Sequence, residues 1–338
     1  MKTKLLIIGL LVSFFGSAQK NPTPAEPVLL YSLPKTELVI EVNAERVNQK
    51  PGDFYQYSER FLATNDVVTS EKTFYRIKQI TVSQRTVADP NRIYKIVPAK
   101  NAIQSLITVN EKGILCGLNV PVVKEKPNKP KELKLTEKKI ESLLPLGEEY
   151  MLAGSVAKMA EGAAKQIYRI RESRAALLTG DTDHLPGDGS SFKYMLDGMD
   201  SQEKQLTELF TGKNAVEPVT STVIFSPDAE ASKKIAFRFS ALSGVVDKDD
   251  LSGSPYFISI EFQPVINSDV AKEKNSIDLY SVIPVTANVK LSDGNNVIFE
   301  EEIIIPQAGA LMPIPVSVLN KDSKVSVSPV TGRLLSIQ

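Results

Sequence analysis

The sequence predicts an α+β fold, in which an antiparallel helical hairpin lies between two antiparallel β-rich, sandwich-like domains. Two observations support this prediction. Residues 155–212 carry apolar side chains at three- and four-residue spacing in two successive segments, which is the pattern of amphipathic helices. On both sides of this region, short runs rich in apolar residues alternate with Gly-, Pro- and Asp-containing turns, which is typical of antiparallel strands.

A chain of 338 residues is long enough for two or three domains. We predict, in order, a signal peptide, an N-terminal β-rich domain, a basic Pro/Lys-rich linker, the helical hairpin and a C-terminal sandwich-like domain. Their predicted boundaries are 1–18, 19–120, 121–147, 148–213 and 214–338.

Residues 1–18 have the three parts of a signal peptide. Lys2 and Lys4 precede a short apolar run, and the small residues 16–18 supply a cleavage site. The run is too short for a permanent membrane helix, although an uncleaved anchor is the alternative. No cysteine stands at the cleavage site, so the pattern is not that of a lipoprotein. We expect an exported protein in the periplasm or associated with the outer membrane, without a transmembrane segment.

The composition excludes some partners and linkages. The 40 basic and 40 acidic side chains balance, so the charge gives no indication of nucleic acid or an anionic membrane surface as a partner. Cys116 is the only cysteine, which excludes a disulfide within the chain. Because it lies in an apolar run, we expect a buried thiol rather than a nucleophile or an intermolecular bridge.

The N-terminal β-rich domain begins with a predicted strand at 38–43 and a turn at Pro51-Gly52. After this turn, Asp53 is placed to cap a short helix that ends near Leu62. The Tyr and Phe residues of that helix are expected to pack on the sheet, or alternatively to form a recognition surface. Further strands are expected at 74–85, 92–97, 104–110 and 113–119.

The segment 121–147 mixes lysines with prolines and a few glutamates. Such a composition resists packing, so we expect an exposed linker, with a polyanion-binding patch as the alternative. The C-terminal domain is expected to contain strands at 221–225, 234–240, 256–262, 279–291, 297–305, 311–318, 324–328 and 333–337.

Both helices of the predicted hairpin end in Thr-Gly, at 179–180 and 211–212, and glycine is a common helix stop. The loop 181–189 between them is short, so the helices should be antiparallel neighbours. The apolar residues on the inner faces are Val156, Met159, Ala163, Ile167, Ile170, Leu177 and Leu178 in the first helix, and Phe192, Met195, Leu196, Met199, Leu206 and Phe210 in the second.

Charged residues interrupt both apolar stripes. Arg174, with Arg171 beside it, falls on the first stripe, and Glu203 falls on the second. A charge that faces a packed interface is costly unless it is paired. The antiparallel register brings Arg171 near Glu203, and Arg174 near Asp197 and Asp200, so we predict structural ion pairs in the hairpin. The alternative is an arginine clamp on an anionic ligand.

The outer face of the hairpin is a possible partner surface, with Tyr168, Arg169 and Glu172 as its candidate residues. The loop residues Asp181, Asp183 and Asp188 form a weak candidate metal site. In an EF-hand calcium loop, however, the places taken here by the Leu-Pro sequence at 185–186 need an oxygen ligand and a glycine, so we expect a plain polar turn.

No catalytic motif or cofactor site is visible. The single histidine lies in the polar loop 181–189, there is no Gly-x-Ser-x-Gly sequence, and one His with one Cys makes zinc unlikely. We therefore expect no cofactor. A pair of carboxylates from distant positions, as in glycoside hydrolases, stays open.

Several segments resemble a known family. The sequences at 164–174, 178–180, 185–189, 202–204 and 209–212 resemble the domain of unknown function 4831, a family of exported proteins found mainly in Bacteroidota. The segment 51–62 resembles the early Gly-Pro-Tyr segment of that family, from which Asp53-Phe54 departs. The resemblance implies a cell-envelope setting in a diderm bacterium, and it carries over no catalytic residues.

We expect a non-enzymatic cell-envelope (periplasmic) interaction or scaffold protein whose partner is another envelope protein. One alternative is a hydrolase acting on glycan or peptidoglycan, which requires two close acidic side chains and a raised pKa. The other is a glycan- or small-ligand-binding module, which requires a pocket.

Overall fold

The computed structural model describes residues 29–96, 107–122, 154–181, 188–264, 279–314 and 323–338. The predicted signal peptide, nearly all of the predicted linker and most of the hairpin loop lie outside these residues. Within them the fold is α+β, as predicted, with antiparallel sheets and a helical hairpin.

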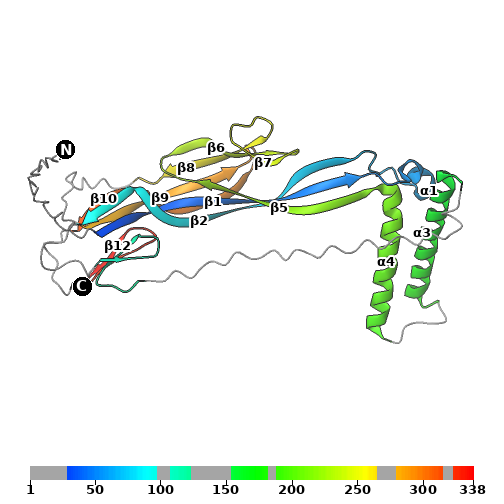
Figure 1. Cartoon of the computed structure of the whole chain (residues 1–338), viewed down its shortest axis with the longest axis horizontal. Helices are drawn as coiled ribbons and strands as arrows, with labels where there is room; N and C mark the ends of the chain where they lie inside the picture. Colours follow the sequence, from blue (N-terminus) through cyan, green and yellow to red (C-terminus); the bar gives the residue numbers. More distant parts are fainter. Residues whose placement is uncertain (1–28, 97–106, 123–153, 182–187, 265–278, 315–322) are drawn as a thin grey trace, which may run out of the picture.

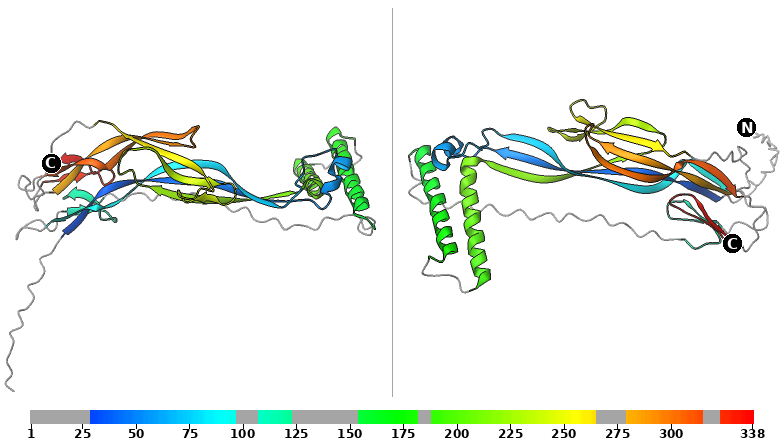
Figure 2. Two further views of the ribbon diagram at one scale, coloured as in Figure 1. Left: turned by 90° about the horizontal axis from the view of Figure 1, so that it is seen from above. Right: turned by 180° about the vertical axis from the view of Figure 1, so that it is seen from behind.

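The described part of the molecule is long and narrow, and the helical hairpin stands across one end of it (Figures 1 and 2). A three-stranded sheet runs along its length. A second sheet covers the part of this sheet that is remote from the hairpin. The C-terminus lies at the end opposite the hairpin, beside a small third sheet (Figure 1).

The longest sheet has the strand order β2-β1-β5. β1 (Leu29–Lys50) pairs with β2 (Lys72–Ile96) on one edge, and its second half pairs with β5 (Lys213–Phe225) on the other. At about 3.3 Å per residue, the 22 residues of β1 span roughly 70 Å. We call the end of this sheet nearest the hairpin, formed by residues 44–50, 72–77 and 213–219, the β arm.

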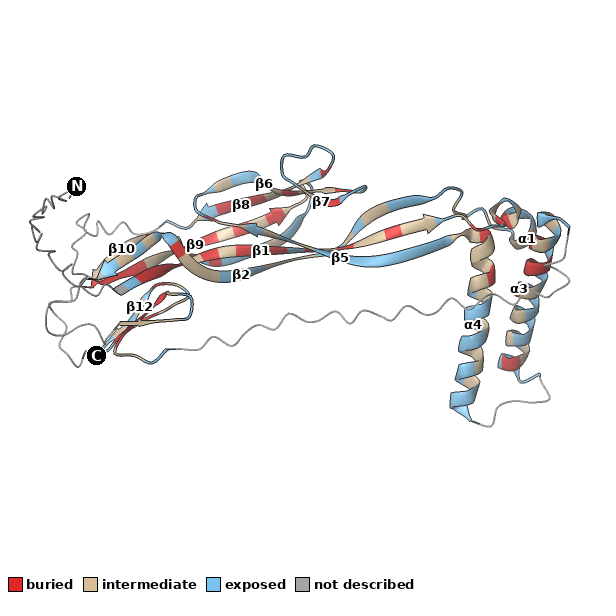
Figure 3. Cartoon of the chain, in the orientation of Figure 1, coloured by how far each residue is buried: buried red, intermediate tan, exposed pale blue. Residues whose placement is uncertain are grey.

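The rest of the long sheet forms a sandwich with a five-stranded antiparallel sheet of order β10-β9-β8-β6-β7. Alternation along β1 places Leu38, Ile40 and Val42 on its inner face, where they are fully buried against side chains of the second sheet (Figure 3). The strands of the second sheet are β6 (Ala231–Ser240), β7 (Gly244–Val246), β8 (Ser254–Phe262), β9 (Leu279–Ser292) and β10 (Val297–Ile314).

A side-chain amide joins the two sheets of the sandwich. Gln307 of β10 donates to the carbonyl of Thr36 in β1 at 2.8 Å and accepts from its N–H at 3.0 Å, in the manner of a neighbouring strand. Arg92 of β2 donates to the carbonyls of Pro306, Gln307 and Gly309 in the same part of β10. These bonds satisfy backbone groups where β10 loses its regular register with β9.

A four-stranded sheet of order β12-β11-β4-β3 lies at the end remote from the hairpin. Cys116 lies in its buried strand β4 and is only 4% exposed, as expected for a core thiol. Tyr31 packs beside this sheet, and its hydroxyl accepts the N–H of Tyr280 at 2.8 Å. Burial raises the pKa of the Tyr31 phenol. The strands are β3 (Ile107–Val109), β4 (Leu115–Leu118), β11 (Val325–Val327) and β12 (Leu334–Ile337).

Strands from the two predicted β domains share sheets, which the sequence did not indicate. β5 pairs with β1, and β11 pairs with β4, so both sheets combine segments from before and after the hairpin. The predicted boundaries at 120 and 214 therefore do not separate two independent sets of strands. Pairing between segments so far apart leaves no local pattern in the sequence.

Two predicted interruptions are bulges inside long strands. The predicted strands 74–85 and 92–97 are one strand, β2, as far as it is described, and 297–305 and 311–318 are parts of β10. The turn-like residues at Asp89-Pro90 and around Gly309 fall where the register with the neighbouring strand shifts. The chain does not reverse there because the flanking residues still pair with the same neighbour.

The short helix after Pro51-Gly52 also differs from the prediction. It consists of a 3-10 turn, η1 (Tyr55–Tyr57), followed by α1 (Ser58–Leu62). The N-cap positions are Phe54 and Tyr57, and neither makes a side-chain cap bond, so Asp53 does not cap a helix. Tyr57 and Phe61 pack against the hairpin rather than against the sheet.

Candidate functional site at the hairpin and its base

The hairpin consists of α3 (Val156–Thr179) and α4 (Gly189–Thr211). Each helix begins with a side-chain cap: the Ser155 hydroxyl accepts the N–H of Lys158, and the Asp188 carboxylate accepts the N–H of Ser191. Among the described residues, no helix is both long and apolar enough to cross a membrane.

The predicted ion pairs lie between the two helices. Arg171 Nε lies 2.6 Å from Glu203 Oε1, and Arg174 Nη2 lies 2.8 Å from Glu203 Oε2. Arg174 also contacts Asp200 through Nη1. Asp197 is exposed, and in the described part of the chain it forms no ion pair with Arg174.

Glu203 is the centre of this cluster, since its carboxylate contacts both arginines. Its side chain is 14% exposed, against 42% for Arg171 and 31% for Arg174. Oε2 lies off the line of an N–H bond, so its contact with Arg174 is an ion pair rather than an aligned hydrogen bond. The hydrogen bond to Asp200 and the charge of Glu203 raise the pKa of Arg174. Carboxylates of α4 therefore pair with the guanidinium groups of Arg171 and Arg174. In the alternative prediction of an arginine clamp, these groups would bind an anionic ligand instead.

The predicted partner surface is only partly free. The Tyr168 hydroxyl donates to the carbonyl of Phe61 at 2.9 Å, which ties α3 to α1. The Arg171 guanidinium lies 5.7 Å from the centre of the Tyr168 ring. Arg169 and Glu172 are exposed on the same helix and remain candidates for contact with a partner.

Of the three candidate metal ligands in the hairpin loop, one caps a helix, one is exposed and one lies outside the described residues. Asp188 caps α4, and its hydrogen bonds with Ser191 lower its pKa. Asp181 is exposed, and Asp183 lies outside the described residues. No group of His, Cys, Asp or Glu side chains within the described ranges is arranged to hold a metal ion.

The base of the hairpin is pressed against the β arm at two glycines. A Cβ atom on Gly52 would lie 2.2 Å from the Leu209 carbonyl oxygen, which already accepts the N–H of Phe54. Gly212 is the only residue between α4 and β5, at φ 89° and ψ 172°, a conformation open essentially to glycine alone. The apolar cluster behind these contacts joins Phe54 to Phe210 of α4.

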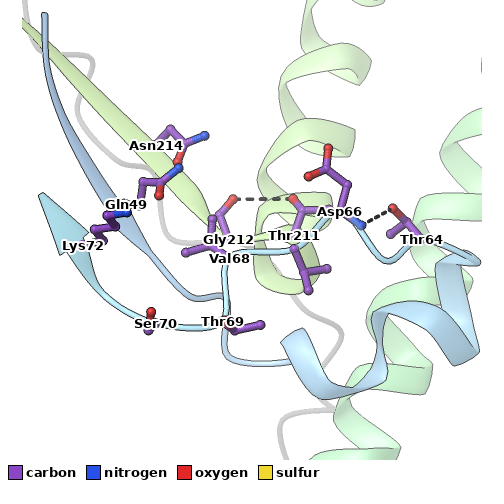
Figure 4. Close-up of a pocket in the computed structure, with 11 residues that line it drawn as sticks. Gln49, Thr64, Asp66, Val68, Thr69, Ser70, Lys72, Thr211, Gly212 and Asn214 are labelled. Atoms are coloured by element: carbon purple, nitrogen blue, oxygen red, sulfur yellow. Dashed lines mark hydrogen bonds between the residues drawn. The ribbon is translucent and has the colours of Figure 1, made fainter. Parts of the chain in front are cut away.

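A polar pocket of about 500 Å³ lies where the β arm meets the hairpin. The adjoining ends of β1, β2 and β5 form one wall, loop 64–70 forms another, and Thr211-Gly212 of the hairpin lies between them (Figure 4). The N–H of Val68 donates to the carbonyl of Thr211 at 2.8 Å, which holds the loop against the end of α4.

The sequence did not identify this pocket. The sequence features that mark its position are the glycines at 52 and 212. The first was interpreted as part of a turn and the second as the end of a helix. Only the pairing of β1 with β5 brings Gln49 opposite Asn214, and only the pairing of β1 with β2 brings it opposite Lys72.

The displaced pKa values of the described carboxyls all lie in one direction. Each one with a displaced pKa has it lowered, by hydrogen bonds from lysine, arginine, serine or amide groups. These residues are Glu45, Glu161, Asp188, Asp250, Asp293 and Glu300. A general acid needs the opposite displacement.

Comparison with known proteins gives one match. The family model described as Domain of unknown function (DUF4831) matches residues 28–335. No curated protein and no solved structure matches the chain.

Proposed function

The chain belongs to the DUF4831 family, and from the geometry of its described residues we propose that it is a non-enzymatic cell-envelope protein. In this proposal it binds another envelope protein through its helical hairpin. We further propose that it is a Bacteroidota protein, exported with cleavage of residues 1–18, and that it acts in the periplasm or at the outer membrane without a lipid anchor.

The observation that carries this proposal is the position of the hairpin at the end of the β arm. β1 runs without a break from the small sheet to the hairpin base, and α4 continues into β5 through the single residue Gly212. The hairpin is therefore fixed in direction at roughly 70 Å from the start of β1. A rigid spacer with helices across its end suits a protein that presents a binding element to a partner.

Two further features support a helical contact surface. The outer face of α3 carries Arg169 and Glu172, both exposed, and neither contributes to the ion-pair cluster. The cluster fixes α3 against α4, so the exposed face is presented in one arrangement and loses little conformational entropy on binding.

The alternative of a glycan- or peptidoglycan-acting hydrolase gains no such support among the described residues. The displaced carboxyl pKa values there are all lowered, and the polar pocket contains one carboxylate, Asp66, rather than a pair.

Crosslinking in cells tests the proposal. A photoreactive amino acid at position 169 or 172 should join the chain to one or two recurring proteins, to be identified by mass spectrometry. The double variant Arg169→Glu/Glu172→Arg should lose these partners. The matched control is Lys248→Glu/Asp249→Lys, on an exposed turn of the sandwich, which should retain them. Recovery of the same partners from the hairpin variant, or of none from the native chain, would refute the proposal.

A further inference from the structure

The pocket at the hairpin base presents polar side chains that make no hydrogen bond or ion pair with the described residues. Gln49, Lys72 and Asn214 occur at paired positions on the three adjacent strands, so they form a row across the end of the β arm (Figure 4). In the described part of the chain, neither side-chain amide makes a hydrogen bond, and the Lys72 ammonium contacts only the ring of Phe74.

The opposite wall adds acceptors and further donors. Asp66 lines the pocket, and its carboxylate has no hydrogen bond or ion pair among the described residues. Its backbone N–H donates to the Thr64 hydroxyl. The Ser70 hydroxyl and the Thr69 side chain also face this space. The N–H of Val68 donates to the carbonyl of Thr211, so the backbone of this loop is held against the end of α4.

The chemistry of this set indicates the class of ligand. Each amide offers two donors and an acceptor, and each hydroxyl offers both functions, which matches a ligand whose own groups both donate and accept. Lys72 and Asp66 are the two ionisable side chains that line the pocket, and their charges cancel, which favours a neutral ligand over an anion or a cation.

An aromatic ring supports the Lys72 side chain. Phe74 is two residues from Lys72 on the same strand and therefore on the same face of the sheet, with its ring centre 5.8 Å from the Lys72 ammonium. The ring does not line the pocket, and its contact with the ammonium helps to hold Lys72 at the pocket edge.

We propose that this pocket is a binding site for a neutral carbohydrate, held by the amides of Gln49 and Asn214, the Lys72 ammonium and the Asp66 carboxylate. The site is independent of partner binding by the hairpin, because Arg169 and Glu172 do not line it.

A glycan array with neutral, sialylated and sulfated members, probed with the purified chain, is the first test. Retention of a neutral glycan supports the proposal. Retention of sialylated or sulfated glycans alone would overturn it in favour of an anion site at Lys72, and retention of none would overturn it outright.

Titration of the best array glycan then locates the site. Gln49→Ala/Asn214→Ala should weaken binding about tenfold or more, because each truncation removes polar contacts with the ligand. The matched control, Gln79→Ala/Gln84→Ala, removes two exposed amides from β2 outside the pocket and should bind like the native chain. In the native chain, the side-chain amide signals of residues 49 and 214 should shift in NMR spectra on binding. Equal affinity in both double variants would place the glycan elsewhere and refute the site.

Discussion

Glu203 stands in an apolar stripe, and the structure explains why a charge is tolerated there. Its carboxylate lies between Arg171 and Arg174 at the seam of the hairpin, and Asp200 takes the other side of Arg174. All these side chains keep some contact with solvent, so the cost of removing the charges from water is moderate. The cluster therefore fixes the register of the two helices more than it raises stability.

Removal of this central charge should loosen the hairpin. In Glu203→Gln, two guanidinium groups lose their shared counter-ion, and we expect a loss of about 1 kcal/mol in the free energy of unfolding. The control Asp197→Asn neutralises an exposed carboxylate on the same helix that has no ion pair with Arg174, and it should change little. Urea denaturation measures both. A cost for Asp197→Asn equal to that for Glu203→Gln would contradict the assigned roles.

The two Thr-Gly sequences that end α3 and α4 have different structural roles. Gly180 takes the left-handed conformation of an ordinary helix end, at φ 75° and ψ 16°, and a Cβ atom there would meet no other atom within 4 Å. Gly212 connects a helix directly to a strand, and a Cβ there would lie 2.6 Å from the Lys50 carbonyl oxygen and 2.7 Å from the Cβ of Val68. One dipeptide thus ends a helix in both places but sets the angle of the hairpin only at Gly212.

Substitution of these two glycines separates the roles. Gly180→Ala should cost about 1 kcal/mol, the usual penalty for an L-residue in the left-handed region. Gly212→Ala adds a backbone collision to a conformation that other residues rarely adopt, so about 3 kcal/mol or more is expected. Thermal unfolding compares the variants, and small-angle scattering would reveal a changed hairpin angle. Equal effects of the two substitutions would be inconsistent with a special role for Gly212.

At the scale of the whole molecule, charged side chains on the long sheet pair across strands. Glu37 contacts Arg85, and Glu45 contacts both Arg76 and Lys78; the basic side chains of β2 are exposed, and the two glutamates of β1 are half-buried. The hydrogen bond from Lys78, followed by that from Arg76, lowers the pKa of Glu45. Such pairs depend on pH and on salt rather than on the apolar core.

Acid should therefore destabilise the folded chain. Because these carboxyl pKa values are lowered in the folded chain, the unfolded chain binds more protons in acid than the folded chain does. The stabilisation of the folded chain by these groups is therefore complete above the ordinary pKa values of 4.5 for Glu and 3.8 for Asp. It is lost as the pH falls through the lower values of the folded state. Melting temperatures between about pH 6 and about pH 3 should decrease, and less steeply in Glu45→Gln. A melting temperature that stays constant or rises in acid would contradict this account.

Local pattern determined the helical hairpin and the presence of strands on both sides of it. The sequence alone predicted the fold class, both hairpin helices within a residue or two, and the contacts of Arg171 with Glu203 and of Arg174 with Asp200, because apolar spacing and short loops specify helices and their antiparallel register. It did not predict the contact of Arg174 with Glu203, and it wrongly placed Asp197 beside Arg174. It also predicted the burial of Cys116, since the flanking residues are apolar.

Tertiary structure decided the arrangement of these elements. The alternation in β1 predicts a strand but does not specify its neighbours, so the sequence could not indicate that β5 and β2 flank it or that β11 joins β4. The same pairing converts the turn-like Asp89-Pro90 into a bulge, and it brings Gln49, Lys72 and Asn214 together at the pocket. Contacts between residues far apart in the chain depend on the packing of the whole molecule, and no local spacing records them.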